Sequence, residues 1–428
     1  MPKAFDAVPL VDIAGLFDPD LRVRAAVAAD LGRAAREVGF LYVTGHRLPA
    51  RLVAELRAAA EAFFAQPLEA KMQSYIGRSA NHSGYVPEGE EVFASGKIDR
   101  KEAYDVNLDL PEAIGEAPML GPNLWPALPG FRQAASAYYE AVSALARRLF
   151  GGFALALGLP EDRFEPHLSR PPSQLRLIHY PFDAEAVDQE GIGAHTDYEF
   201  FTILHSTAPG LEVRNGAGDW VDAPPVPGAF VVNIGDMLEV WTNGEFTATA
   251  HRVRKVSEER YAFPYFATCD YPTVVEPAAP FVTRDRPARY GRLVSGEHLY
   301  AQTVNTFRYL APSAGGSPYE RRGAGGGPPL RGPPGCSELD AWMFPEALDH
   351  LRQRRGGRPD PGDLDPEPRP DRRHPDPGEP APTLAPAQPA RLLARRAGGR
   401  RLGGGRRGRH GLWARADELV ELGRLPAL

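Results

Sequence analysis

The sequence predicts a mainly β protein with flanking helices, and three observations lead to this fold class. From residue 174 onward, short apolar segments follow one another at the regular spacing of a sandwich or barrel. Before them lie segments whose apolar residues recur at helical spacing. Near Leu310 the composition changes sharply. We therefore expect an N-terminal α/β region at residues 5–120, a core of one long helix and many strands at 121–310, and a tail at 311–428.

Strands and helices alternate in the N-terminal region. A short strand is expected at 7–13, a helix at 22–38, a strand at 39–44 and a second helix at 49–65. The longest helix candidate, at 133–157, carries its apolar residues on one face, so we expect it to pack across a sheet.

Strands dominate the core. They are expected at 175–180, 201–205, 211–213, 230–234, 251–253 and 260–263. The dipeptides Gly235-Asp236 and Asn243-Gly244 favour turns between strands. No internal repeat is found.

The tail has the composition of a disordered chain. Its 118 residues include 20 Gly and 19 Pro, and its 20 Arg are interleaved with 15 acidic residues. Only 338–351 and 413–425 have the pattern of short helices. A nucleic-acid-binding arm is the alternative, but the interleaved acids and the scarcity of aromatics argue against it.

The composition also limits the class of protein. The 428 residues carry a net charge of -6, which gives no reason to expect a nucleic-acid partner. No apolar run approaches the roughly 18 residues of a membrane span, and the first residues lack the pattern of a signal peptide. The two cysteines suit a reducing compartment. We expect a cytoplasmic protein with no membrane contact and no obligate protein partner.

His195 and Asp197 form the strongest candidate site. Residues i and i+2 of a strand point to one face, so an imidazole and a carboxylate would lie side by side, and His251 in a later strand is the candidate third ligand. Two histidines and one carboxylate on one face of a metal are typical of non-haem Fe(II) oxygenases. The alternative is a strand-end histidine, a turn aspartate and a core histidine, which such a pair alone would favour.

Arg260 follows nine residues after His251 and begins a strand. A guanidinium beside the metal strand is suited to grip a carboxylate in bidentate fashion. The alternative is a surface arginine paired with Glu258 or Glu259 on a hairpin. Arg176 leaves the same choice open, between an acidic substrate group and a salt bridge, and spacing favours the salt bridge. Tyr85, Phe201 and Phe266 are candidates to line a pocket, although packing is the commoner role.

Four stretches strongly resemble the iron- and 2-oxoglutarate-dependent dioxygenases of the isopenicillin N synthase-like superfamily. They are His195–Leu204, Pro209–Val213, Asn233–Gly244 and Thr249–Val253. The segments Val8–Ile13 and Gly39–His46 are similar to that family's N-terminal region. The resemblance covers roughly residues 5 to 310, and the tail has no counterpart in it.

The resemblance implies a distorted double-stranded β-helix, or jelly roll, with helices on its outer face. It implies that His195, Asp197 and His251 bind Fe(II), that Arg260 anchors the distal carboxylate of 2-oxoglutarate and that Tyr180 helps to hold this co-substrate. O₂ would take the remaining position. The expected reaction forms succinate and CO₂ and hydroxylates, desaturates or cyclises a small molecule. The substrate itself is not indicated by the sequence.

Two departures from the family pattern concern the co-substrate. Ala262 stands where the family usually has a serine, which removes one hydrogen bond of about 1 kcal/mol, and Ile178 stands where it frequently has an asparagine. They keep open a related oxidase that does not use 2-oxoglutarate. The sequence also leaves open a non-catalytic binding module on the same fold and another metal hydrolase or isomerase. The complete ligand set argues against the binding module, and Arg260 argues against the hydrolase or isomerase.

Overall fold

The computed structural model describes residues 4–310, except for 92–98, 116, 183, 185–190 and 255. These residues all belong to one compact unit of the chain. The predicted tail at 311–428, with its two helix candidates, lies outside the described residues, so its disorder stays a prediction. No helix in the described part is both long and apolar enough to cross a membrane.

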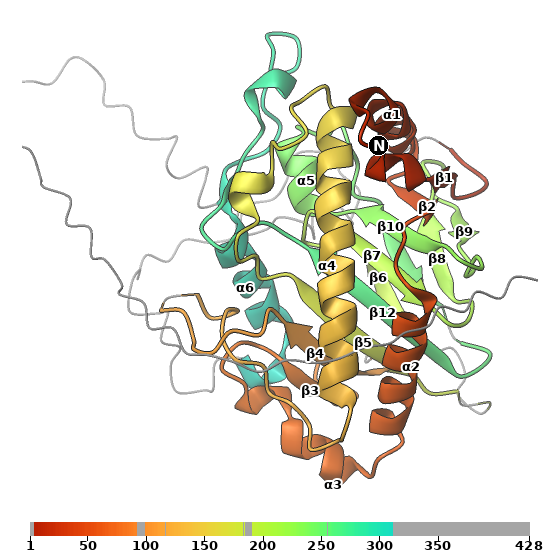
Figure 1. Cartoon of the computed structure of the whole chain (residues 1–428), viewed down its shortest axis with the longest axis vertical. Helices are drawn as coiled ribbons and strands as arrows, with labels where there is room; N and C mark the ends of the chain where they lie inside the picture. Colours follow the sequence, from red (N-terminus) through yellow and green to blue (C-terminus); the bar gives the residue numbers. More distant parts are fainter. Residues whose placement is uncertain are drawn as a thin grey trace, which may run out of the picture. The chain divides into compact units, whose positions relative to one another are not determined.

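Two sheets form the centre of this unit (Figure 1). The larger consists, in spatial order, of β1 (Leu10–Asp12), β2 (Phe40–Thr44), β10 (Phe230–Ile234), β7 (Phe201–Ser206), β12 (Arg260–Ala267), β5 (Gln174–Tyr180), β4 (Glu102–Asn107) and β3 (Gly84–Val86). The smaller consists of β6 (Ile192–His195), β11 (His251–Val253), β8 (Leu211–Arg214) and β9 (Trp220–Asp222). A two-stranded ribbon joins β13 (Val274–Val275) to β14 (Leu293–Val294). Every pair is antiparallel except β1 with β2.

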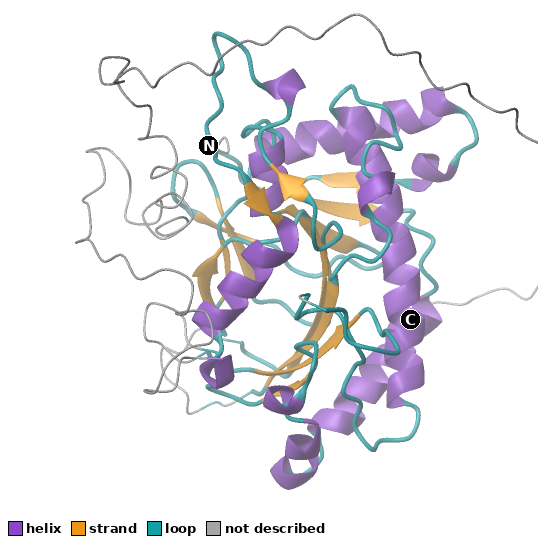
Figure 2. Ribbon diagram, turned by 90° about the vertical axis from the view of Figure 1, so that its left-hand side faces the viewer, coloured by secondary structure: helices purple, strands orange, loops and turns teal. Residues whose placement is uncertain are grey.

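The three longest helices, Leu21–Glu37, Ala50–Phe64 and Phe131–Ala156, lie together on one side of the strands (Figure 2). The α-helices are α1 (Leu21–Glu37), α2 (Ala50–Phe64), α3 (Leu68–Lys71), α4 (Phe131–Ala156), α5 (Asp236–Trp241) and α6 (Ser295–Thr306). Short 3-10 helices span Ala14–Phe17, Met72–Ser74, Ile76–Arg78, Glu165–His167, Ala279–Phe281 and Arg308–Leu310. The predicted helices at 22–38, 49–65 and 133–157 thus correspond to α1, α2 and α4.

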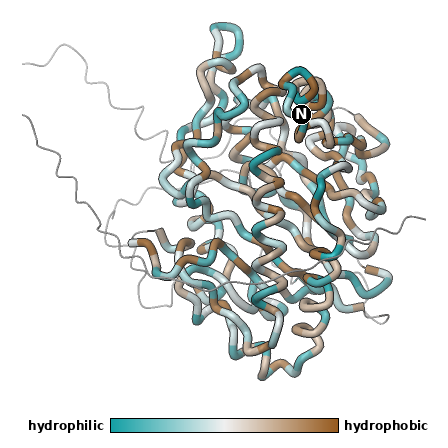
Figure 3. The backbone as a smooth tube through the Cα atoms, in the orientation of Figure 1, coloured by the Kyte–Doolittle hydropathy of each residue, from teal (hydrophilic) through white to brown (hydrophobic). Residues whose placement is uncertain are grey.

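Helix α4 packs on the large sheet through aromatic side chains. Hydrophobic and hydrophilic residues alternate along this central helix in Figure 3, as expected for a helix with one face on a core. Phe150 and Phe153 meet Phe201 of β7 with ring centroids 4.7 and 5.3 Å apart. Burying each such ring contributes roughly 1.5–3 kcal/mol, so this contact fixes which face of β7 turns outward.

The opposite face of the large sheet is turned toward the small sheet. Because side chains alternate along a strand, Thr202, Leu204 and Ser206 of β7 point away from the helices. The same alternation places Arg260 and Ala262 of β12 on this inner face, in register with Tyr180 and Ile178 of β5. The inner face of the large sheet and the edge of the small sheet supply the candidate site.

The sequence interpretation missed several elements. A turn was predicted at Gly235-Asp236, but Asp236 begins the helix α5 (Asp236–Trp241). The turn predicted at Asn243-Gly244 follows the end of this helix, with φ angles of 54° and 74°. Strands β3, β4, β9, β13 and β14 and helix α6 were not predicted. Strands β1 to β4 share the large sheet with strands of the core, and the division near residue 120 stays a prediction.

Candidate active site

Three side chains from the small sheet and its adjoining turn converge at one point. His195 ends β6 and pairs directly with His251, which begins β11. The Nε2 atoms of these histidines lie 3.7 and 3.6 Å from Oδ1 of Asp197. In the described part of the chain, this is the one group of three such side chains with ligand atoms within 4.8 Å of one another. The structure therefore brings together the three residues that the motif singled out.

Asp197 does not continue the strand, although the sequence pattern predicts that it does. β6 ends at His195, and the chain then turns. A hydrogen bond of 2.8 Å from the amide of Asp236 to the backbone carbonyl of Asp197 stabilises this turn. The start of α5 therefore holds the turn that returns the carboxylate toward the two imidazoles.

Hydrogen bonds orient both histidines. Nδ1 of His195 lies 2.9 Å from the carbonyl of Gly193, and Nδ1 of His251 lies 3.3 Å from the carbonyl of Thr249. With the proton on Nδ1, each Nε2 lone pair faces Asp197. Burial, with the neighbouring His251, lowers the pKa of His195 to about 4, so this imidazole is neutral and able to bind a metal at neutral pH.

The two oxygens of Asp197 have different surroundings. Oδ2 accepts hydrogen bonds from the hydroxyl of Thr202 and, at 2.6 Å, from Nδ2 of Asn233. Oδ1 faces the imidazoles. Burial alone would raise the pKa of Asp197, but the two histidines and these hydrogen bonds together lower it, so the group is an anion at neutral pH. Two imidazoles and one carboxylate on one side match the facial ligand set of non-haem iron sites.

Arg260 is buried at the first position of β12, where it pairs with Tyr180 of β5. Its Nε donates a hydrogen bond of 3.2 Å to the carbonyl of Ala208, and its guanidinium carbon lies 4.6 Å from the centre of the Tyr180 ring. Nη1 has no hydrogen-bond partner among the described residues. A buried cation with an unused donor is costly unless an anion completes it, so the site fits a carboxylate ligand.

A cavity of about 830 Å³, including its open mouth, adjoins the three converging side chains. His195 and Asp197 form part of its wall, and α6 covers it with polar and apolar side chains. The remaining lining residues are His82, Glu91, Lys101, Met119, Pro172, Gln174, Arg176, Ile178, Ile192, Thr196, Tyr198, Glu199, Phe266, Leu299, Gln302, Thr303, Thr306 and Phe307. Of the three aromatic candidates, Phe266 lines this cavity, whereas Tyr85 and Phe201 pack in the helix-facing core.

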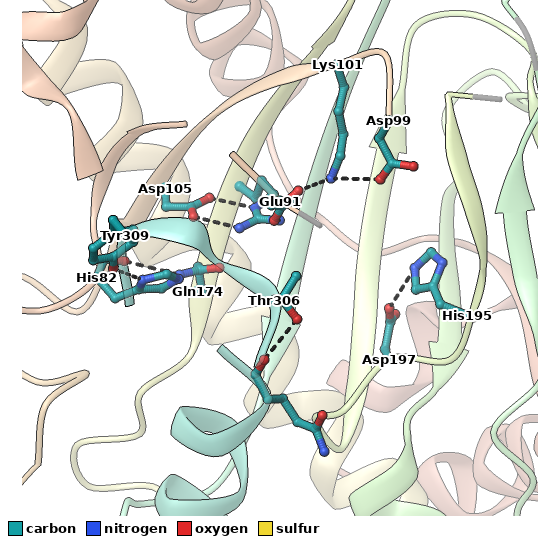
Figure 4. Close-up of polar contacts among 12 residues, drawn as sticks. His82, Glu91, Asp99, Lys101, Asp105, Gln174, His195, Asp197, Thr306 and Tyr309 are labelled. Carbon is teal, nitrogen blue, oxygen red and sulfur yellow. Dashed lines mark hydrogen bonds and ion pairs between the residues drawn. The ribbon is translucent and has the colours of Figure 1, made fainter. Parts of the chain in front are cut away.

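Ion pairs form one wall of the cavity (Figure 4). Arg176 donates two hydrogen bonds of 2.7 Å to Asp105 and one of 2.5 Å to Glu91. Lys101 also pairs with Glu91 and lies 3.8 Å from Asp99. Burial opposes the ionised form of Glu91, but the two cations lower its pKa to about 2. The salt-bridge interpretation of Arg176 is confirmed, and its side chain also lines the cavity.

Glu199 extends the acidic character of the wall toward Asp197. It lines the cavity, and no ion pair joins its carboxylate to a cation within the described residues. Burial, together with the negative charge of Asp197, raises the pKa of Glu199 to about 8. This group, like Glu91 and Lys101, was not singled out from the sequence, because an isolated charged residue carries no spacing signal.

Two family models match the chain. The N-terminal domain described as non-haem dioxygenase in morphine synthesis matches residues 8–128, and the 2OG-Fe(II) oxygenase superfamily matches residues 171–268. Solved structures also resemble it. A 2OG-Fe(II) oxygenase family protein from Caulobacter crescentus is 30% identical with a TM-score of 0.63, over 70% of this chain and 99% of that one. A full-length Neurospora crassa protein in complex with alpha-KG is 25% identical with a TM-score of 0.62, over 69% and 95%.

Named relatives match 60–72% of the chain. A homoarginine-6-hydroxylase of rice is 36% identical over 329 residues, which is 72% of this chain and 99% of the relative. A 2-oxoglutarate-Fe(II) type oxidoreductase of Metarhizium majus is 35% identical over 289 residues, or 60% and 76%. These matches, together with the jelly-roll architecture, confirm the predicted fold class. The chain therefore belongs to the 2-oxoglutarate- and Fe(II)-dependent oxygenases, and it is an oxidoreductase that uses Fe(II), 2-oxoglutarate and O₂.

Proposed function

We propose that this enzyme hydroxylates a small cationic substrate related to basic amino acids, with Fe(II) held by His195, Asp197 and His251. The observation that carries this proposal is the convergence of three ligand atoms beside both a buried arginine and a cavity. The ligand atoms face one another across less than 4.8 Å, as one shared metal ion would require. Arg260 and Tyr180 are proposed to hold 2-oxoglutarate.

The bound iron and 2-oxoglutarate supply oxygen activation, in which the keto acid is converted to succinate and CO₂ while the substrate is oxidised. The protein supplies position and surroundings. Thr202 and Asn233 hold Oδ2 of Asp197, so that Oδ1 stays turned toward the histidines. Arg260 offers Nη1 to the distal carboxylate, and Tyr180 lies against the guanidinium as a neutral hydroxyl, because burial raises its pKa.

Apolar side chains line the space between these polar groups. Ile178, Ile192, Val253 and Ala262 belong to one buried cluster with Tyr180. They exclude water from the path between Arg260 and the three ligands, which strengthens each electrostatic contact there. His195 and Asp197 also border the cavity, so a substrate in the cavity would lie next to the metal.

The charge of the cavity wall supports a cationic substrate. Glu91, Lys101 and Arg176 line the cavity, and Asp99 and Asp105 pair with the two cations from outside the lining, so that three acids face two cations in this network. Oδ2 of Asp99 is buried without a hydrogen-bond partner among the described residues. Glu199, whose pKa of about 8 keeps it protonated at neutral pH, adds a carboxyl group next to Asp197 that a bound cation would ionise. A guanidinium or ammonium group of a substrate would form charge-assisted hydrogen bonds with these carboxylates.

The relatives support the same substrate class. Proteins of rice, soybean and Arabidopsis named homoarginine-6-hydroxylase are 33–36% identical to this chain. Homoarginine combines a guanidinium group with an amino-acid group. Hydroxylation is therefore favoured here over desaturation or ring closure. A cytoplasmic location and the absence of nucleic-acid partners stay predictions from composition.

Incubation with Fe(II), 2-oxoglutarate and a panel of amino acids tests this proposal. Homoarginine, arginine and lysine are compared with homocitrulline, the neutral counterpart of homoarginine in which a ureido group replaces the guanidinium. We expect substrate-dependent succinate and a product heavier by one oxygen atom with a cationic member only. Equal turnover of homocitrulline and homoarginine would contradict the cationic substrate.

A matched pair of variants connects this preference to the cavity wall. A bound cation favours the ionised form of Glu199, and an amide cannot supply that charge, so Glu199→Gln is expected to raise KM for the cationic substrate by about tenfold. Glu212→Gln, whose carboxylate pairs with Arg252 on the small sheet at 2.6 Å, is the control and should leave KM unchanged. An unchanged KM in Glu199→Gln would remove this residue from substrate recognition.

A further inference from the structure

The inner face around Arg260 has few polar groups that could share an anionic ligand. Ala262 lies two residues further along the same strand, so it presents a methyl group on the same face. Its direct partner on β5 is Ile178, and on β7 the residue Leu204 lies two positions away, opposite Pro264. A carboxylate bound by Arg260 alone would have acceptor sites to spare, because each carboxylate offers about four.

Ser206 lies on this face as well. It ends β7 and pairs directly with Ala262 of β12, and directly paired residues of an antiparallel sheet have Cβ atoms roughly 4.5–5.5 Å apart. Thr202, four residues earlier on β7, donates a hydrogen bond to Asp197, which shows which side this set of residues faces. His205 and Phe263 stack with a ring-centroid distance of 6.1 Å on the other side. The Ser206 hydroxyl is therefore directed to the inner face.

The neighbourhood of Ser206 is bound to Arg260 through the backbone. Ala208, two residues after Ser206, accepts the hydrogen bond from Nε of Arg260. The hydroxyl of Thr207 accepts a hydrogen bond of 2.9 Å from the amide of Tyr261, which fixes the end of β7 against the start of β12. Ser206 is partly exposed, and within the described residues its hydroxyl has no hydrogen-bond partner.

We propose that Ser206 donates a hydrogen bond to the distal carboxylate of 2-oxoglutarate, beside Arg260. The hydroxyl thus comes from the neighbouring strand, at the position facing Ala262, and not from β12 itself. This inference rests on the proposed function, since it requires Arg260 to bind that carboxylate. It identifies a co-substrate-binding residue outside the segment that follows Arg260.

Two keto acids separate this contact from other effects of a substitution. 2-Oxoglutarate carries the distal carboxylate, and 2-oxopentanoate has the same chain without it. Their dissociation constants are measured by anaerobic titration of the Fe(II)-loaded full-length protein. Ser206→Ala should weaken 2-oxoglutarate by roughly tenfold, as expected for a hydrogen bond to a charged group, and should leave 2-oxopentanoate unchanged. Ser143→Ala removes a hydroxyl that meets Tyr265 instead, 2.8 Å away, and should change neither value.

Adding a hydroxyl on the other strand gives a second test. Ala262→Ser in the Ser206→Ala background should restore most of the lost affinity, because it places a hydroxyl across the same strand pair. In the wild-type background, Ala262→Ser should raise the affinity for 2-oxoglutarate by less than about threefold, since Ser206 already donates a hydrogen bond there. A tenfold gain in the wild type would contradict the inference, and this arm remains decisive if Ser206→Ala does not fold.

Arg260→Ala separates this inference from the proposed function. If Arg260→Ala loses affinity for 2-oxoglutarate while Ser206→Ala does not, only the role of Ser206 is refuted. If Arg260→Ala binds 2-oxoglutarate as the wild type does, the co-substrate site itself is wrong.

Discussion

At the scale of single residues, the site depends on groups that never touch the metal. Oδ2 of Asp197 is held by Thr202 and Asn233, which come from β7 and β10 of the large sheet, whereas the proposed ligands come from the small sheet and its turn. Thr202 and Asn233 are themselves paired across these strands. The two sheets are thereby joined at the carboxylate that faces both histidines.

Removing one of these supports should weaken metal binding without unfolding the protein. Asn233→Ala leaves Oδ2 with one hydrogen bond fewer, so the carboxylate is free to rotate, and we expect Fe(II) or Mn(II) affinity to fall by about 10- to 100-fold. The measurement is a metal titration of the apo protein.

Thr242→Val is the matched control for this prediction. Thr242 is also buried, but its hydroxyl meets the carbonyl of Leu238 at 2.8 Å in α5. It should lower the free energy of unfolding while leaving metal affinity unchanged. Equal metal affinity in Asn233→Ala and the wild type would show that Asp197 does not need this support.

The sequence was sufficient to predict the residues that converge, but not their supports. His195 and Asp197 are two residues apart, so their proximity is local. Only His251 has to be brought to them by the fold. The pairing of Thr202 with Asn233 depends on strand register, which no short motif encodes. The acids of the cavity wall come from segments that are distant in sequence, so their proximity follows only from the folded sheet. The role of Arg260 was predicted from the family resemblance, since its place in a strand left a surface salt bridge equally open, and this role stays a prediction.

At the scale of elements, a buried histidine joins the ends of β5 and β12. His179 lies between two carboxylates, at 2.9 Å from Glu102 on β4 and in contact with Glu259, which precedes β12. Lys71 and Tyr85 each meet Glu102 at 2.6 Å. The ring of His179 stacks on Tyr261, with centroids 4.8 Å apart. The neighbours of His179 and Glu259 along the two strands are Tyr180 and Arg260, so this junction supports the proposed co-substrate site.

This junction should make stability depend on pH. Burial alone would lower the pKa of His179, but Glu102 and Glu259 raise it above its ordinary value. A raised folded-state pKa contributes stability that is fully present below about pH 6.5 and is lost as the pH rises through the folded-state value. As the pH rises from 6 to 9, the free energy of unfolding of His179→Gln should therefore fall by less than that of the wild type.

Urea unfolding at the two pH values measures this difference. His167→Gln is the control, because it removes a histidine from a 3-10 helix outside the junction, and it should keep the pH dependence of the wild type. An identical pH dependence in His179→Gln and the wild type would contradict a charged His179 in the folded protein.

Element types were predictable where the sequence pattern was long. Helix α4 follows from 26 residues of regular periodicity. Strand β3 has three residues, and β13 and β14 have two each, so their alternation is too short to recognise. Helix α5 was missed because it is only six residues long and lies between two dipeptides that favour turns. Tertiary contacts, such as the hydrogen bond between Asp236 and Asp197, decide this segment.

At the scale of the whole molecule, the relatives match only part of the chain. The rice relative matches 72% of this chain with 99% of its own length, and the described structure ends at Leu310. The site, the cavity and α6 all lie before this point.

A shortened chain tests whether the tail is needed. A protein ending at Tyr319 should keep the full succinate yield and the unfolding temperature of the full-length chain, since every described contact is retained. The comparison is made by parallel turnover and thermal unfolding of the two proteins. Loss of folded protein on shortening would contradict the predicted disorder of residues 311–428.

The central claim is that Fe(II) and 2-oxoglutarate bind together between the converging ligands and Arg260. It is tested most directly by anaerobic titration of the apo protein with Fe(II) and then 2-oxoglutarate, with detection of the weak visible charge-transfer band of an iron-bound keto acid. Arg260→Ala is compared with Arg254→Ala, a control whose guanidinium pairs with Asp222 at the surface. We predict a band in the wild type and in Arg254→Ala, and a far higher 2-oxoglutarate requirement in Arg260→Ala. Bound iron without a band, or equal requirements in all three proteins, would contradict the account.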